Sequence, residues 1–368
     1  MLAKLKMPYF TINNAQNRGM LNLSNSYHYE SIKELGNLFI SGKIKLSNFL
    51  FDYKKSMSIS DATLLKRSGK KVYGIKKLKN HVTKSYETLQ DLLIHVERSN
   101  GLNLITDFKI INHNKKHLTK PEEIAKAIRS GKIKKNSWFI IDGGLKSKEL
   151  LKEARVHSIK LVTRLNKNFV VSLFGIKFRE EDVQSKVNPI RRNIKGKCYI
   201  IYPLKRCIWN KVAGNLFLVK GEEYKNFIPV FTISLKSKPE TIIQKYLERF
   251  SIEQTNKESK SYLDIEGSYF RKKESNYGNL FVKFLIHNFV QYLRPKLDNR
   301  SFKEISDNLS LYLLWKYPPK CVFELEKLLS NSNRDMGFNW QTQLNINLNN
   351  SDWSYEVDMN PNLAEYYV

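Results

Sequence analysis

The hydrophobic pattern of this chain changes its period after Ile111, and that change most constrains the fold. Before it, apolar residues alternate with polar ones from Ser56 to Leu65, and alternation in steps of two is typical of a strand. Two further β-prone runs, 92–97 and 102–111, are joined by Ser99-Asn100-Gly101, a typical hairpin turn. The sequence therefore predicts three consecutive antiparallel strands.

The residues that follow alternate between helix and strand patterns. Pro121-Glu122-Glu123 places a proline and two acids in the first turn of a helix that runs to Gly131. A short apolar strand over 138–141, a second helix over 146–157 and another strand over 159–164 come next. This order predicts an α/β fold with an RNase H-like core, a mixed sheet flanked by helices, lacking only its last helix.

Several short β-prone runs delay that last helix. They are Phe169 to Phe174, Cys198 to Tyr202, Leu216 to Val219 and Ile228 to Ile233. We interpret residues 168–233 as a β-rich insertion that interrupts the core. Helical segments over 239–263 and 279–293 would then complete it.

These patterns divide the chain into five expected parts. They are an N-terminal region over 1–50 that is a candidate for DNA contacts, a first part of the catalytic core over 51–167, the insertion over 168–233, the remainder of the core over 234–322, and an acidic tail over 323–368. The N-terminal region contains one amphipathic stretch, 29–39, and no clear helix-turn-helix pattern.

The charge balance indicates the kind of partner. The 368 residues carry a formal charge of +28, from 63 Lys and Arg against 35 Asp and Glu. From Phe323 on, seven acidic residues outnumber two basic ones, so the first 322 residues hold 61 basic and 28 acidic residues and a charge of +33. Such an excess most often reflects a polyanionic partner. We expect the body of the protein to bind nucleic acid.

Cysteine usage and hydropathy indicate a cytoplasmic location. Cys198, Cys207 and Cys321 fit neither paired disulfides nor a paired C-x-x-C zinc site, so we expect reduced thiols. No apolar run reaches the roughly 18 residues of a membrane span, and residues 1–20 lack the pattern of a signal peptide. We therefore expect a cytoplasmic, nucleoid-associated protein that does not contact a membrane.

Four polar residues are spaced to share one face of the helix predicted after Pro239. Tyr246, Arg249, Glu253 and Lys260 follow one another at intervals of three, four and seven residues, which confines them to an arc of roughly 60°. Arg249 and Glu253 alone would be an ordinary ion pair on a surface helix. The complete set of four is more specific.

This set resembles the Tyr-Arg-Glu-Lys signature of DDE transposases of the insertion-sequence-four group, known from prokaryotic insertion sequences. The stretch that carries it reads Tyr246-Leu-Glu-Arg249-Phe-Ser-Ile-Glu253, followed by Lys260. Upstream, Ile140-Ile-Asp142 resembles the block around the second catalytic aspartate, and Ile59-Ser-Asp61-Ala-Thr63 resembles the block around the first. The resemblance covers roughly residues 55 to 295.

The resemblance implies metal-dependent cleavage at the ends of a mobile element followed by strand transfer, with Asp61, Asp142 and Glu253 as catalytic metal ligands. Two Mg²⁺ ions about 4 Å apart, for which Mn²⁺ can substitute, would activate the nucleophile and stabilise the leaving oxygen. Carboxylates are natural ligands of Mg²⁺. Tyr246, Arg249 and Lys260 would contact phosphates near the cleaved bond. The implied partner is double-stranded DNA, both terminal inverted repeats and target, bound by a dimer.

Alternatives remain open at several positions. Asp52 could replace Asp61 as the first ligand, Asp142 could only cap a helix, and Glu253 could be a plain ion-pair partner. Trp209, the one tryptophan of the expected insertion, is a candidate to stack on a flipped base, as in some family members, or an ordinary packed aromatic. The protein could also be an RNase H-like nuclease without strand transfer, or a catalytically silent DNA-binding protein derived from a transposase.

Overall fold

The structure is a computed structural model that describes residues 26–49, 57–67, 71–80, 83–113, 117–222, 224–267, 270–296 and 300–306. Asp52 and the acidic tail lie outside these residues. The chain divides into two compact units. Residues 32–261 and 265–288 form the larger unit, and the smaller one comprises 1–31, 262–264 and 289–368. Within the described part of the smaller unit, Tyr262 stacks on Phe302 with ring centroids 5.8 Å apart.

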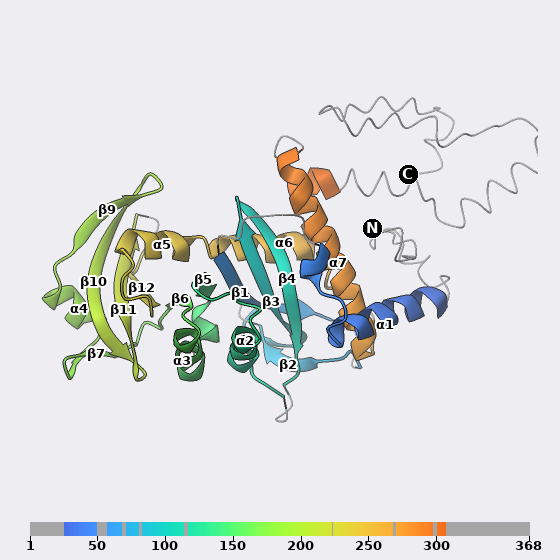
Figure 1. The fold of residues 1–368 in the computed structure, drawn as a ribbon, viewed down its shortest axis with the longest axis horizontal. Coiled ribbons are helices and arrows are strands. Elements are labelled where there is room, and N and C mark those ends of the chain that lie inside the picture. The colour runs from blue at the N-terminus through green and yellow to red at the C-terminus, as the bar shows by residue number, and fades with distance from the viewer. Residues whose placement is uncertain are drawn as a thin grey trace, which may run out of the picture. The chain divides into compact units, whose positions relative to one another are not determined.

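One mixed sheet organises the larger unit (Figure 1). Its strands are β1 (Met57–Lys66), β2 (Ile75–Lys79), β3 (Tyr86–Ser99), β4 (Leu102–Ile111), β5 (Trp138–Ile141), β6 (Lys160–Arg164), β7 (Val171–Leu173), β8 (Ile176–Phe178), β9 (Ile190–Ile194), β10 (Lys197–Trp209), β11 (Val212–Gly221) and β12 (Ile228–Thr232). In the described residues these twelve strands follow the order β2-β3-β1-β5-β6-β12-β11-β10-β7-β8, with β4 paired to β3 and β9 paired to β10.

The first half of the sheet confirms the predicted RNase H-like order. β1, β3 and β4 are antiparallel neighbours, β5 runs parallel to β1, and β6 runs parallel to β5. The sequence reading missed β2, whose residues Ile75-Lys-Lys-Leu-Lys79 include three lysines and no fully buried side chain. β2 lies at one end of the strand order, where lysines are common because they discourage pairing with other chains.

Helices cover the sheet on both faces. α2 (Lys120–Arg129) and α3 (Lys148–Val156) bury their apolar sides in one cluster with β5 and β6. On α2, Thr119 and Glu122 form the capping box that starts the helix. The ring of Phe108 on β4 stacks instead on Phe39 of α1 (Ser26–Ile40), with centroids 4.6 Å apart, and contacts α7 (Lys273–Leu293).

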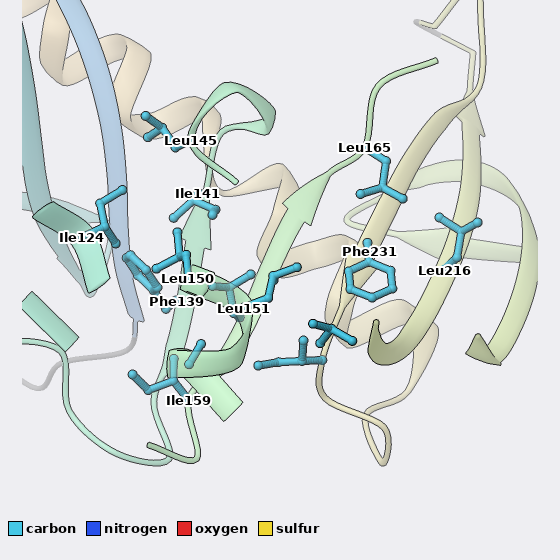
Figure 2. Packing of buried hydrophobic residues seen from close by; sticks show 14 of the residues in the cluster. Ile124, Phe139, Ile141, Leu145, Leu150, Leu151, Ile159, Leu165, Leu216 and Phe231 are labelled. Carbon is cyan, nitrogen blue, oxygen red and sulfur yellow. The ribbon is translucent and has the colours of Figure 1, made fainter. Parts of the chain in front are cut away.

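The predicted β-rich insertion is continuous with the core sheet. β12 pairs antiparallel with β6, with Phe231 opposite Thr163, and β11 pairs with β12. The hydrophobic cluster also continues, from Ile124 and Phe139 to Leu216 and Phe231 (Figure 2). All four predicted β-prone runs contain strands, whereas the sequence reading missed β8, β9 and the helix α4 (Glu180–Lys186).

The prediction of a single helix over 239–263 is wrong in one respect, because two helices occupy these residues. α5 (Pro239–Leu247) and α6 (Phe250–Tyr262) are separated by Glu248 and Arg249. Arg249 N donates to Tyr246 O and Ile252 N donates to Arg249 O, both at 3.0 Å. These i to i+3 bonds wind the chain more tightly than an α-helix. Neither glycine nor proline marks the break, so local sequence could not reveal it.

Two glycines allow α1 and α7 to cross closely within the larger unit. A Cβ atom on Gly36 would lie 1.7 Å from Glu274 O, and one on Gly278 would lie 1.9 Å from Ile32 O. Both distances are far below contact distance. The backbones therefore meet where a side chain would hold them apart.

Replacing Gly278 with alanine should destabilise the protein, because the added methyl group must push two backbones apart. We expect a loss of about 1–3 kcal/mol in the free energy of unfolding, the usual range for overpacking. Urea unfolding followed by circular dichroism measures it. At a freely exposed helix position the same change would stabilise by about 1 kcal/mol, so a gain in stability would contradict the close crossing.

Candidate active site

The strand register places Asp61 beside Asp142. β1 and β5 are parallel, and their last recorded pair is Ser60 with Ile141. Asp61 and Asp142 are the next residue of each strand path, and residues opposite one another on neighbouring strands lie side by side. The two carboxyl groups are close enough to influence each other's charge. Two acids 81 positions apart in the sequence thus meet where β5 ends beside β1.

Local structure fixes the orientation of Asp142. The buried strand β5 ends at Ile141, and Asp142 Oδ2 accepts a hydrogen bond of 3.0 Å from Gly144 N. Asp142 therefore caps the short 3₁₀ turn Gly143–Leu145, while α3 has its own cap in Ser147. A cap uses only one carboxylate oxygen, so the cap interpretation and a ligand role are compatible.

Arg249 joins the second aspartate to the glutamate. Its Nη1 lies 3.5 Å from Asp142 Oδ1, and its Nη2 donates to Glu253 Oε1 at 2.9 Å. The guanidinium is buried and sits over the rings of Tyr246 and Phe250, 5.9 Å and 5.0 Å from their centroids. Its Nε has no hydrogen-bond partner among the described residues. Arg249, in the break between α5 and α6, thus contacts both Asp142 and Glu253.

The environment raises the pKa of Asp61 to about 6. Burial is the main cause, since it disfavours the charged carboxylate. The N–H of Ala62 opposes the rise, and the negative charge of Asp142 adds to it. Asp61 is therefore the acid of this site that gains most from a neighbouring cation.

Asp142 behaves in the opposite way. Burial alone would raise the pKa of Asp142, but the N–H of Gly144 and the positive charge of Arg249 outweigh burial and lower it. The two neighbouring aspartates consequently differ in charge near pH 5, where Asp142 is ionised and Asp61 is mostly protonated.

Replacing Asp61 with asparagine should stabilise the protein at neutral pH in the absence of divalent metal. The pKa of Asp61 is about 6 in the folded state against 3.8 for an unperturbed aspartate, so the folded state binds the proton more tightly. Stability is then lost as pH rises from about 4 to about 6. Asparagine does not titrate, and the gain at pH 7 should be about 3 kcal/mol.

Urea unfolding at pH 4 and pH 7 with EDTA present measures this effect. Asp142→Asn is the matched control, because the pKa of Asp142 is lowered and its ionised form stabilises the fold. Equal effects of the two substitutions at pH 7 would show that the environments of the two acids do not differ as described.

The remaining predicted site residues lie at different depths. Tyr246 is buried beneath Arg249, and burial raises the pKa of its phenol. Lys260 Nζ donates to Leu64 O on β1 at 2.7 Å and lies 3.4 Å from Glu266. Tyr246 and Arg249 are therefore buried, whereas Lys260 extends from α6 to the backbone of β1.

Trp209 ends β10 and packs on Phe231 with ring centroids 5.8 Å apart. It borders the hydrophobic cluster that the insertion shares with the core. Asn210 and Lys211, both with positive φ, form the tight turn that follows. This placement agrees with the packed-aromatic interpretation, and a role in base stacking stays a prediction.

Sequence reasoning missed Lys146 at this edge. Its Nζ donates to Asn166 Oδ1 at 2.8 Å and to Gly143 O, which ties the turn after β5 to the chain after β6. Burial lowers the pKa of Lys146, and Asp142 partly opposes this. The only sequence signal that could have identified Lys146 as a site residue was its position four residues after Asp142.

The donor set suits a divalent cation, although no group of three metal-ligating side chains comes together within the described ranges. Arg249 lies between Asp142 and Glu253 and holds the glutamate toward the aspartate. Asp61 and Asp142 repel each other and offer only oxygen ligands, the kind that Mg²⁺ prefers. A cation between them would relieve the repulsion.

An RNase H-like core in which Asp61 within β1 lies beside Asp142 at the end of β5, with a glutamate linked to Asp142 through an arginine, defines a candidate metal-dependent nucleic-acid enzyme. The family model described as the transposase DDE domain matches residues 52–289. The chain therefore belongs to the DDE transposase family.

Comparison with solved structures shows the fold. The piggyBac transposase, solved by cryo-EM as a synaptic complex with hairpin DNA, matches with a TM-score of 0.50 and 12% identity over 88% of this chain. The match spans 66% of the piggyBac chain. The NurA nuclease from Sulfolobus solfataricus gives a TM-score of 0.28 and 11% identity, over 62% of this chain and 86% of that one. No curated protein matches.

No helix within the described ranges is both long and apolar enough to cross a membrane.

Proposed function

We propose that this protein cleaves DNA at the ends of its own element and joins those ends to target DNA, with Asp61, Asp142 and Glu253 as the metal-binding catalytic residues. The observation that carries the proposal is the meeting of Asp61, within β1, and Asp142, at the end of β5, with Arg249 linking Asp142 to Glu253. Membership of the transposase DDE domain family supports it.

The three carboxylates would hold two Mg²⁺ or Mn²⁺ ions. Bound there, the ions supply activation of the attacking water or 3′-hydroxyl and stabilise the leaving oxygen. Asp61 contributes only when deprotonated, because metal ligands must lose their proton. Asp142 is held in one orientation by Gly144 N, so its second oxygen is directed away from the turn.

Arg249 and Lys260 act on the substrate side of this arrangement. Arg249 orients Glu253, and its Nε, which has no hydrogen-bond partner in the described part of the chain, gives it a further donor for a phosphate oxygen. Lys260 donates to Leu64 O on β1 and would contact a DNA phosphate near the cut. Tyr246 supports the Arg249 guanidinium through its ring. Trp209 is the candidate for contact with a displaced base.

The Tyr-Arg-Glu-Lys spacing supports assignment to the insertion-sequence-four group of prokaryotic elements. Transposition needs two element ends held together, so we propose a dimer that binds terminal inverted repeats and then target DNA. The synaptic complex of the piggyBac transposase, a protein with a similar fold, supports paired ends. The formal charge of +28 supports a DNA partner.

The test is a cleavage assay on duplex DNA that carries the flanking ends of the element, with Mg²⁺ or Mn²⁺. The proposal predicts nicks at the element end and, when target DNA is added, joined products. Cleavage without joining would instead support an RNase H-like nuclease. Binding without cleavage would support a catalytically silent, transposase-derived DNA-binding protein.

A further inference from the structure

Three cations from three separate elements converge on Glu248, the first residue of the break between α5 and α6. Arg98 Nε on β3, Lys195 Nζ in the β9–β10 turn and Lys245 Nζ on α5 each lie 3.6 Å from one of its carboxylate oxygens. One negative charge is thus surrounded by three positive ones. This group, the Glu248 cluster, carries a net charge of +2.

The distances show that none of the three cations is tightly bound to Glu248. Charge-assisted hydrogen bonds between nitrogen and oxygen are about 2.7–2.9 Å long, whereas all three separations are 3.6 Å. The Lys195 side chain is 55% exposed, and Glu248 only 11%. The carboxylate lies beneath its cations, and the most exposed part of the cluster is positive.

Other contacts hold the cluster in place. Arg98 Nη1 donates to Asn103 Oδ1 at 2.8 Å, and Asn103 Nδ2 donates to Ser251 O at 2.9 Å, which fixes α6 against the β3–β4 hairpin. Lys195 has a φ of 53° and forms a two-residue turn with Gly196, so the chain projects its side chain from a defined position. Arg192 on β9 also pairs with Glu240 on α5.

The cluster is connected to the candidate active site through the chain between α5 and α6. Arg249, the next residue after Glu248, is the side chain that contacts Asp142 and Glu253. Lys245 lies one helical turn before Arg249. A ligand bound to the cluster would therefore contact the segment between α5 and α6, from which Arg249 reaches Asp142 and Glu253.

We propose that Arg98, Lys195 and Lys245 form a binding site for a backbone phosphate of DNA, away from the phosphate that is cut. This inference rests on the proposed function and names a contact surface for its substrate. A phosphate diester carries one negative charge and accepts hydrogen bonds from several cations at once. Glu248 keeps the three cations gathered when DNA is absent, and their excess charge attracts the phosphate.

Binding of a short duplex DNA, measured by fluorescence anisotropy between about 50 and 200 mM salt, tests the site. Lys195→Gln should lower the slope of log affinity against log salt by about 0.9, which corresponds to about 3.5-fold less weakening over that range. Lys152→Gln on α3 removes the same charge from an exposed position and is the matched control. Indistinguishable behaviour of the two variants would overturn the proposal.

Glu248→Gln separates a phosphate site from a purely structural ion-pair cluster. If the cations bind phosphate, removing the buried negative charge should leave DNA affinity unchanged or raise it, opposite to the effect of Lys195→Gln. If the cations only stabilise Glu248, both variants should weaken binding alike, and the proposal fails. Absence of DNA binding by the unmodified protein would instead reject the proposed function itself.

Discussion

Replacing Asp142 with asparagine is expected to reduce DNA cleavage by more than about 10³-fold, the scale on which removal of a central catalytic group acts. Asparagine keeps the size of the side chain and an oxygen that can accept from Gly144 N, so the turn after β5 should persist. It loses the negative charge that a divalent cation requires. Single-turnover cleavage of an element-end duplex with Mg²⁺ measures the loss.

Binding must be followed in the same experiment. Asp142→Asn removes a negative charge from a site that receives DNA, so affinity for the duplex should be retained or increased. Asp61→Asn and Glu253→Gln should behave in the same way if all three carboxylates hold metal. Glu181→Gln, at an exposed position of α4, is the control and should cleave normally. Substantial cleavage by Asp142→Asn would refute its role as a ligand.

The second large effect concerns salt. The excess of 28 positive charges predicts an interface dominated by phosphate contacts. For a protein that makes six to ten such contacts, affinity falls by about 10³–10⁵ between about 50 and 200 mM salt, because condensed counterions are released on binding. The affinity for duplex DNA should decrease by that order.

Titration of the duplex at several salt concentrations measures the slope, and a neutral osmolyte at matched osmolality controls for changes in water activity. A decrease of less than tenfold would mean that few phosphates are contacted. The positive charge of the first 322 residues would then not reflect DNA binding, and the interpretation that it indicates a nucleic-acid partner would be wrong.

Parts of the fold could be predicted because period and turn signals agreed. β4 begins after the Asn100-Gly101 turn, as predicted. β5 occupies the predicted apolar run 138–141, which stops before Asp142-Gly143-Gly144. The lysine-rich β2 lacks the alternation of apolar and polar residues that would predict a strand. It forms a strand because it pairs with β3. Strand signals fail where a strand is exposed at an edge.

The candidate site was accessible to sequence reasoning only through the family resemblance. Nothing local shows that Asp61 lies on a strand paired with β5, since that register depends on contacts across the whole sheet. The break at Glu248 was also hidden, because Asn103, far away in the sequence, donates to Ser251 O at the start of α6. The raised pKa of Asp61 depends on burial, which a sequence does not report.

The pairing of β12 with β6 has a consequence for how this protein can vary. The chain leaves the core after β6 and returns on the adjacent strand β12, so exit and return are one strand spacing apart, about 4.8 Å. The entropy cost of closing the intervening segment grows only slowly with its length. Insertions and deletions between these two strands can therefore accumulate over evolution while the spacing of the acids stays constant.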